Sequence, residues 1–121
     1  MSFIKYQQGD VLLFKVTKEE FEKANLSTRI TTHKTRAVLA EGEETGHYHA
    51  IYMEDMLEEA GITLCKRSEW MRENQGLIVE GNEVTIKHEE HNPITIPVGY
   101  YLQRIVKEYD PISGLIRGVA D

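Results

Sequence analysis

Short runs of alternating apolar and polar residues recur along this chain, separated by Gly, Pro and polar clusters. Alternation with a period of two is typical of half-buried β-strands. It predicts strands over residues 10–16, 36–40, 47–53, 62–66, 77–80, 83–86 and 100–109. Gly81 and Asn82 separate two of these runs and predict a tight β-hairpin. Because the strands are short and numerous, the pattern favours an antiparallel β-sandwich or a small barrel, with a jelly-roll arrangement as one form of it.

Helical patterns are few. Thr17 and Glu20 have the spacing of a capping box, which predicts a short helix over residues 18–24. Residues 54–60 are good helix formers that end before Gly61, and they favour a second short helix. Residues 68–74 predict a helical turn with Trp70 and Met71 as its anchors. We therefore expect a mainly β domain with one or two short helices.

The length of 121 residues fits one domain over residues 1–121. No run approaches the roughly 20 apolar residues of a membrane span. The N-terminal residues lack the apolar stretch of a signal peptide, so we expect a cytoplasmic protein without a membrane segment. Cys65 is the only cysteine, which excludes an internal disulfide framework and any zinc site built from several cysteines.

The formal net charge of −6 argues against DNA as the main partner. A small-molecule ligand is the partner that we expect. Two further partners stay open: a second copy of the chain, because symmetric dimers are common, and a basic host protein, which the negative charge would suit.

Four of the five histidines lie in two short stretches, residues 42–49 and 88–93, and each stretch also carries adjacent glutamates. Imidazole beside carboxylate is typical of divalent-metal sites and of proton-transfer sites. His47 and His49 would point to the same side of an extended strand. His88 and His91 are three residues apart, so they converge only if the backbone bends between them. If that strand stays straight, His88 and Glu90 share a face instead.

We therefore expect a divalent metal ion, with zinc, manganese, nickel and iron all open, held by His47, His49, His88 and His91. Glu44 is a candidate fourth ligand or base, and His91 is also a candidate catalytic acid or base. Such a site would hydrolyse a small phosphorylated or nucleotide-like substrate. One alternative is a metal-free phosphodiesterase in which the histidine pairs act as general acid and base. Another is a non-catalytic protein that binds a ligand or a host protein.

Arg104 lies on a predicted strand and shares a face with Tyr100, Leu102 and Val106, so an otherwise apolar stripe carries a guanidinium. We interpret Arg104 as a catalytic anion clamp or as the partner of a structural ion pair with a glutamate such as Glu44, Glu89 or Glu108.

Several motifs resemble those of a family of small uncharacterised proteins in bacterial and phage genomes. Residues 42–49 read Gly-Glu-x-Thr-Gly-His-x-His, residues 88–94 read His-Glu-Glu-His-x-Pro-Ile, and residues 97–101 read Pro-x-Gly-x-Tyr. The chain departs from the pattern at Lys107, where arginine is expected, and in residues 54–70. The resemblance implies that the histidines are important for the function of the protein, but it implies no particular activity. A weaker likeness to cupins is architectural only, because His88 and His91 precede the Pro-x-Gly turn.

Overall fold

The structure is a computed structural model of the chain and describes residues 4–41, 46–71, 73–109 and 116–118. Of residues 107–109 and 116–118 it describes the backbone alone. The elements, in chain order, are β1 (Ile4–Gln8), β2 (Val11–Val16), α1 (Lys18–Lys23), β3 (Thr28–Ile30), β4 (Arg36–Glu41), β5 (Tyr48–Tyr52), the 3-10 turn η1 (Met53–Asp55), β6 (Gly61–Lys66), β7 (Gly76–Glu80), β8 (Val84–Ile86), β9 (Ile94–Ile96), β10 (Gly99–Ile105), β11 (Lys107–Tyr109) and β12 (Ile116–Gly118).

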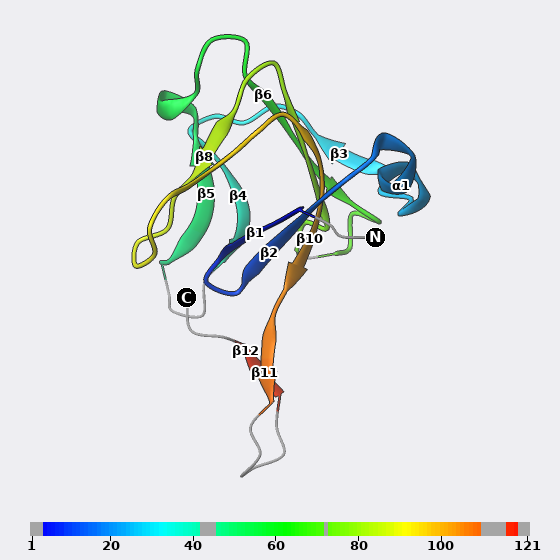
Figure 1. Cartoon of the computed structure of the whole chain (residues 1–121), viewed down its shortest axis with the longest axis vertical. Coiled ribbons are helices and arrows are strands. Elements are labelled where there is room, and N and C mark those ends of the chain that lie inside the picture. The colour runs from blue at the N-terminus through cyan, green and yellow to red at the C-terminus, as the bar shows by residue number, and fades with distance from the viewer. Residues whose placement is uncertain (1–3, 42–45, 72, 110–115, 119–121) are drawn as a thin grey trace.

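Two layers of antiparallel strands form the body of the molecule (Figure 1). The larger layer is a six-stranded sheet with the order β1-β2-β10-β7-β6-β3. The second layer contains the pairs β4-β5 and β8-β9, which a bridge between Ala50 and Lys87 joins edge to edge. Among the described residues the strands do not close into a barrel, so the sandwich form of the predicted fold is confirmed.

Apolar side chains from both layers fill the space between them. Leu13, Leu77 and Tyr101 from the six-stranded sheet and Leu39 and Ile51 from the second layer are among the largest side chains that are fully buried there. Burial of this apolar surface is the main favourable term in folding.

A second apolar cluster lies on the outer face of the six-stranded sheet, where α1 covers part of it. Phe21 of α1 is 1% exposed and packs with Leu26, Cys65 and Ile78. The capping box predicted at the start of this helix is confirmed. The Thr17 hydroxyl accepts a hydrogen bond from the backbone N–H of Glu20, and a Glu20 carboxylate oxygen accepts one from the backbone N–H of Thr17.

Amide side chains of the six-stranded sheet join the layers at two places. The Gln103 Nε2 group donates to the Leu39 carbonyl at 2.9 Å, beside a register shift in β4. The Gln8 Nε2 group donates to the carbonyls of Ile86 and Asn92, at 2.9 and 3.0 Å. The second pair of bonds fixes the loop between β8 and β9 against β1, and this loop carries two of the clustered histidines.

The predicted tight hairpin at Gly81 is wrong. β7 pairs with β6 and β10, whereas β8 pairs with β9, so the chain changes layers at this corner. Both flanking segments are strands as predicted, but β7 is buried on both faces whereas β8 alternates between buried and half-buried residues. The local pattern could not reveal that Gly81 packs against the backbone of residue Glu59, which turns the chain away from β7.

Three other expectations need correction. Residues 54–60 do not form a helix, since only the short turn η1 (Met53–Asp55) is present. Trp70 and Met71 do not anchor a core, because their side chains are 91% and 37% exposed. The predicted last strand divides at Val106 into β10 and β11, and β11 with β12 forms a hairpin that projects from the body (Figure 1). Among the described helices, none has the length and apolar character to cross a membrane.

Candidate functional site

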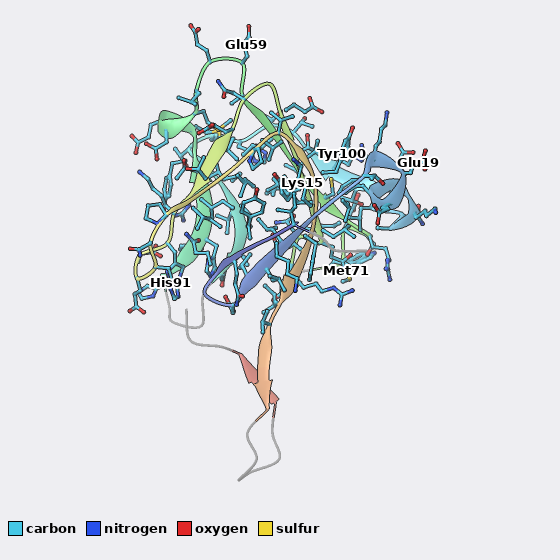
Figure 2. All side chains as sticks on the ribbon, in the orientation of Figure 1. Lys15, Glu19, Glu59, Met71, His91 and Tyr100 are labelled. Carbon is cyan, nitrogen blue, oxygen red and sulfur yellow. The ribbon has the colours of Figure 1, made fainter. Side chains whose placement is uncertain are left out.

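Four histidine rings gather at one end of the second layer. His47 precedes β5 and His49 lies within it, whereas His88 and His91 lie in the loop between β8 and β9. The ring centroid of His88 is 4.3 Å from that of His49, 4.9 Å from that of His91 and 5.6 Å from that of His47. Figure 2 shows His91 in this loop at the edge of the molecule. The structure thus brings both histidine stretches together.

The backbone between His88 and His91 bends, as their convergence requires. Backbone hydrogen bonds between Ala50 and Lys87, at 3.0 and 2.8 Å, hold the end of β8 beside β5. One residue later the chain leaves the strand, and the backbone N–H of Glu90 donates to His88 Nδ1 at 3.1 Å. This local bond turns the loop back over the His88 ring, so the alternative in which His88 and Glu90 share a straight strand face does not apply.

His49 is fully buried and both of its ring nitrogens have partners. Nδ1 lies 2.9 Å from Gln8 Oε1, and Nε2 lies 3.0 Å from Asp10 Oδ1. The Gln8 amide nitrogen is bound to two carbonyls, so its oxygen must be the atom that faces His49. His49 Nδ1 therefore carries a proton and donates it to Gln8.

The second His49 nitrogen shares a proton with Asp10. Either Nε2–H donates to the carboxylate, or a protonated carboxyl donates to Nε2. Because imidazole is a stronger base than carboxylate, we expect the proton on His49, which makes a buried ion pair with Asp10. In this arrangement neither nitrogen of His49 is available to a metal ion. We assign His49 a supporting role, stacked beside His88 and His91.

Three other residues bring candidate metal-ligand atoms close together. One potential ligand atom from each of His47, His88 and Glu89 lies within 4.8 Å of the others. The Glu89 carboxylate is positioned by the backbone N–H of Tyr48, which donates to Oε2 at 2.9 Å. Desolvation raises the pKa of Glu89, but hydrogen bonds from the backbone N–H groups of Tyr48 and Glu89 and electrostatic interactions with His88 and His47 outweigh it. The pKa of this carboxyl is therefore below its usual range, which favours the anion that a metal requires.

His91 and Glu90 lie at the border of this group. The His91 Nε2 atom is buried, and none of the described residues forms a hydrogen bond with it. Its ring lies 6.3 Å from that of His49, nearly parallel to it. Glu90 Oε1 lies 3.9 Å from His47 Nδ1, and the Glu90 side chain is half exposed. A further nitrogen and a half-exposed carboxylate thus lie next to the three candidate ligands.

A shallow cavity of about 230 Å³ opens beside the group, lined by Tyr52, Glu54, Lys87, His88 and Glu89. Lys87 Nζ forms an ion pair with Asp55 Oδ2 at 2.7 Å. This hydrogen bond and the charge of Asp55 raise the pKa of Lys87, so the ammonium stays charged. Lys87 is the lysine that lines this cavity, and Asp55 already balances its charge.

The structure does not bring Arg104 to the histidines. Arg104 is exposed on the outer face of β10, whereas Tyr101 and Gln103, which point inward, are buried. Its guanidinium carbon lies 5.9 Å from the Phe14 ring centroid. Among the described residues no carboxylate forms an ion pair with Arg104, so pairing with Glu89 is wrong. Glu44 lies outside the described residues, and the side chain of Glu108 does as well.

Sequence reasoning missed Gln8 and Asp10. Both flank Gly9, whose φ of 55° turns the chain between β1 and β2. Polar residues around a glycine look like an ordinary exposed turn. The two side chains instead point inward and are 3% and 4% exposed. Asp10 directly precedes β2, but only the pairing of distant strands reveals its contact with His49.

Comparison with known proteins adds one finding. The family model described as "Domain of unknown function (DUF8820)" matches residues 7–106. The matched segment includes the whole histidine cluster and ends just before β11. No curated protein and no solved structure matches the chain. The expected relation to an uncharacterised family is confirmed.

Proposed function

Because the chain belongs to the family of the DUF8820 domain, whose function is unknown, we propose a function from the site geometry. We propose that the protein binds one divalent metal ion through His47, His88 and Glu89. The supporting observation is that ligand atoms from two segments about forty residues apart lie within 4.8 Å of one another. Bond lengths near 2.1 Å would place neighbouring ligands about 3–3.5 Å apart, so binding needs only a small closure of the loop.

Two imidazoles and one carboxylate form a donor set that suits zinc in hydrolytic sites and iron(II) in open three-ligand sites. Manganese and nickel also accept such donors. His91 is the candidate fourth ligand, because its buried Nε2 has no hydrogen-bond partner among the described residues. The His49–Asp10 pair and Gln8 support the cluster from behind, as outer residues orient the ligands of many metal sites.

We further propose that the site hydrolyses a small phosphorylated or nucleotide-like substrate. A bound metal would supply Lewis acidity and a water of lowered pKa. The Glu90 carboxylate, close to His47, would accept a proton, and Lys87 would orient an anionic group in the adjacent cavity. Lys87 thus takes the role that the sequence suggested for Arg104.

The hydrogen bond at His88 makes metal binding detectable at one backbone amide. A histidine that binds a metal through one ring nitrogen carries a proton on the other. His88 Nδ1 instead accepts the Glu90 N–H, so Nδ1 is unprotonated. Metal at either nitrogen must therefore displace this N–H, and the Glu90 amide resonance should move on binding.

The test combines titration with spectroscopy on untagged protein. Zinc, manganese, nickel and iron(II) are each added to chelator-treated protein, and bound metal is measured by elemental analysis after desalting. We expect about one bound ion per chain for at least one of these metals, together with a shift of the backbone amide resonance of Glu90. His88→Ala should lose the metal, whereas His33→Ala, a histidine outside the cluster, should retain it. No retained metal in the wild type, or retention by a folded His88→Ala variant, contradicts the proposal.

One observation favours a metal-free alternative. The Glu90 N–H bond leaves the neutral His88 ring with its proton on Nε2, 4.0 Å from Glu89 Oε2. His88 could then donate a proton while a neighbouring imidazole accepts one, as general acid and base on a phosphodiester. With bis(p-nitrophenyl) phosphate as the probe, this alternative predicts hydrolysis with a bell-shaped pH profile that persists in excess chelator. Hydrolysis that requires an added metal supports the first proposal instead.

A further inference from the structure

The outer face of the six-stranded sheet carries two cationic side chains beside apolar ones. In the strand register, Lys5 of β1 and Leu102 of β10 lie on either side of Phe14 of β2, and Arg104 lies opposite Leu12. The Lys5 Nζ atom is 6.0 Å from the Phe14 ring centroid, and the Arg104 guanidinium carbon is 5.9 Å from it. Two cations therefore flank one aromatic ring, on a chain whose net charge is −6.

A cavity of about 250 Å³ adjoins this ring between the sheet and α1. It is lined by Phe14, Val16, Leu102, Arg104 and Glu20. Three of these side chains are apolar and form a floor that is only partly buried. Small-molecule sites typically combine such an apolar surface with a few polar groups that fix orientation.

The lining carries one cation, Arg104, and one carboxylate, Glu20, and Lys5 lies beside the Phe14 ring. Glu20 is the acidic residue of the lining, and its Oε1 atom accepts hydrogen bonds from the Thr17 N–H and hydroxyl, at 3.2 and 3.0 Å. That carboxylate is therefore committed to the start of α1. Arg104 forms no ion pair with the described residues, although a guanidinium can hold a carboxylate through two parallel hydrogen bonds.

We propose that this outer pocket binds a small apolar carboxylate, with its carboxylate on Arg104 and its hydrocarbon part against Phe14, Val16 and Leu102. The site is independent of the proposed metal site. Arg104 and Leu102 project from the face of β10 opposite to the buried Tyr101 and Gln103, which face the second layer. Lys5 adds a second positive charge beside the ring. A shallow pocket of this size should give a dissociation constant on the order of 1 mM for a ligand of about ten heavy atoms.

Octanoate is the probe, and binding is followed by backbone amide chemical shifts of the full chain. We expect saturable shifts at Phe14, Val16, Leu102 and Arg104, with the histidine loop unaffected. Octylamine and 1-octanol share the hydrocarbon part but lack the anion, and acetate has the anion without the hydrocarbon part. All three should shift these amides at least tenfold less at equal concentration.

Arg104→Gln removes the charge and should weaken octanoate binding at least tenfold. Arg29→Gln is the matched control, because Arg29 is exposed and lies 5.9 Å from the Phe21 ring, but it does not line the pocket. Leu102→Ala tests the apolar floor without altering charge and should weaken binding several-fold. Non-saturable shifts, equal shifts with 1-octanol, or unchanged affinity in Arg104→Gln would overturn the proposal. Shifts centred on Lys87 and the histidine loop would place carboxylate binding at the other site and also overturn it.

Discussion

At the scale of single residues, the best-defined feature of the site is the hydrogen-bonded set Gln8–His49–Asp10. Gln8 cannot rotate its amide, because two carbonyls hold the nitrogen. His49 therefore has one orientation and one proton assignment at Nδ1. An imidazolium at this buried position would need such complete satisfaction, since an unpaired charge in the interior costs several kcal/mol. This set fixes the ring against which His88 and His91 pack.

Replacement of Asp10 tests whether the pair is ionic. Asp10→Ala leaves a buried imidazolium without its counter-charge, and we expect the free energy of unfolding to fall by about 3–5 kcal/mol at pH 7. Asp10→Asn should cost less, since an amide oxygen still accepts from Nε2. Urea denaturation followed by circular dichroism measures both.

The comparison for Asp10 is Asp55, which pairs with Lys87 at the surface. Asp55→Ala should change stability much less, because exposed ion pairs are screened by water. A loss in Asp10→Ala no larger than that in Asp55→Ala would show that the buried pair is not ionic.

At the scale of elements, α1 depends on its N-terminal cap. The helix has six residues and makes few internal hydrogen bonds, so the capping box and the burial of Phe21 hold it in place. Thr17→Ala should lower the free energy of unfolding by about 1 kcal/mol, measured by urea denaturation. Thr17→Ser retains the hydroxyl and should be close to the wild type. Equal stability of the Ala and Ser variants would mean that the cap contributes nothing.

Gly81 marks the corner where the chain changes layers, and it tolerates no side chain. Its φ is +76°, and a Cβ built there would lie 1.8 Å from the Glu59 carbonyl oxygen. We expect Gly81→Ala to cost about 2 kcal/mol or more, because strain and a backbone clash add. Gly61→Ala is the matched control, since its Cβ would have no neighbour within 4 Å and its φ is not positive. Similar thermal midpoints for the two variants would contradict this account of the corner.

The elements show where sequence patterns suffice and where they fail. Alternation and capping chemistry predict β2, β4, β6 and α1 well, since each depends on neighbours within a few residues. The prediction at Gly81 fails because the residue that it packs against, Glu59, is more than twenty residues away in the sequence. The prediction that Trp70 anchors a helical turn also fails. Its size suggests a core anchor, but Trp70 lies outside both apolar clusters, and its ring is exposed.

At the scale of the whole molecule, the sequence indicates the histidine cluster but not its internal roles. Clustering along the chain is enough to predict that His47, His49, His88 and His91 meet. The contacts of each ring nitrogen depend on β1 and the turn that follows it, which supply Gln8 and Asp10 from the opposite layer. Likewise, alternation shows that Arg104 and Tyr101 lie on opposite faces of β10. Which of these faces points toward the second layer is set by the topology. Long-range pairing is the part that local patterns do not encode.

Two buried weak acids give the whole molecule a pH dependence. Burial raises the pKa of the Cys65 thiol, and the nearby Arg29 charge lowers it by less. Burial also raises the pKa of Tyr101 well above its usual value, with a smaller contribution from Tyr6. Both groups bind protons more tightly in the folded state. Their contribution is therefore complete below the unfolded pKa values, about 8.5 and 10, and is lost as pH rises through the folded values.

We expect the free energy of unfolding to decline above about pH 8.5, by up to roughly 1.4 kcal/mol per pH unit for each titrating group. Urea denaturation at pH 7, 9 and 10.5 measures the decline. Cys65→Ala should flatten the curve between pH 8.5 and 10, because the thiol no longer titrates on unfolding. Tyr101→Phe should flatten it above pH 10, at the expense of the hydrogen bond from the Tyr101 hydroxyl to the Pro97 carbonyl. Stability that stays constant to pH 10.5 in the wild type would show that neither group is held protonated by the fold.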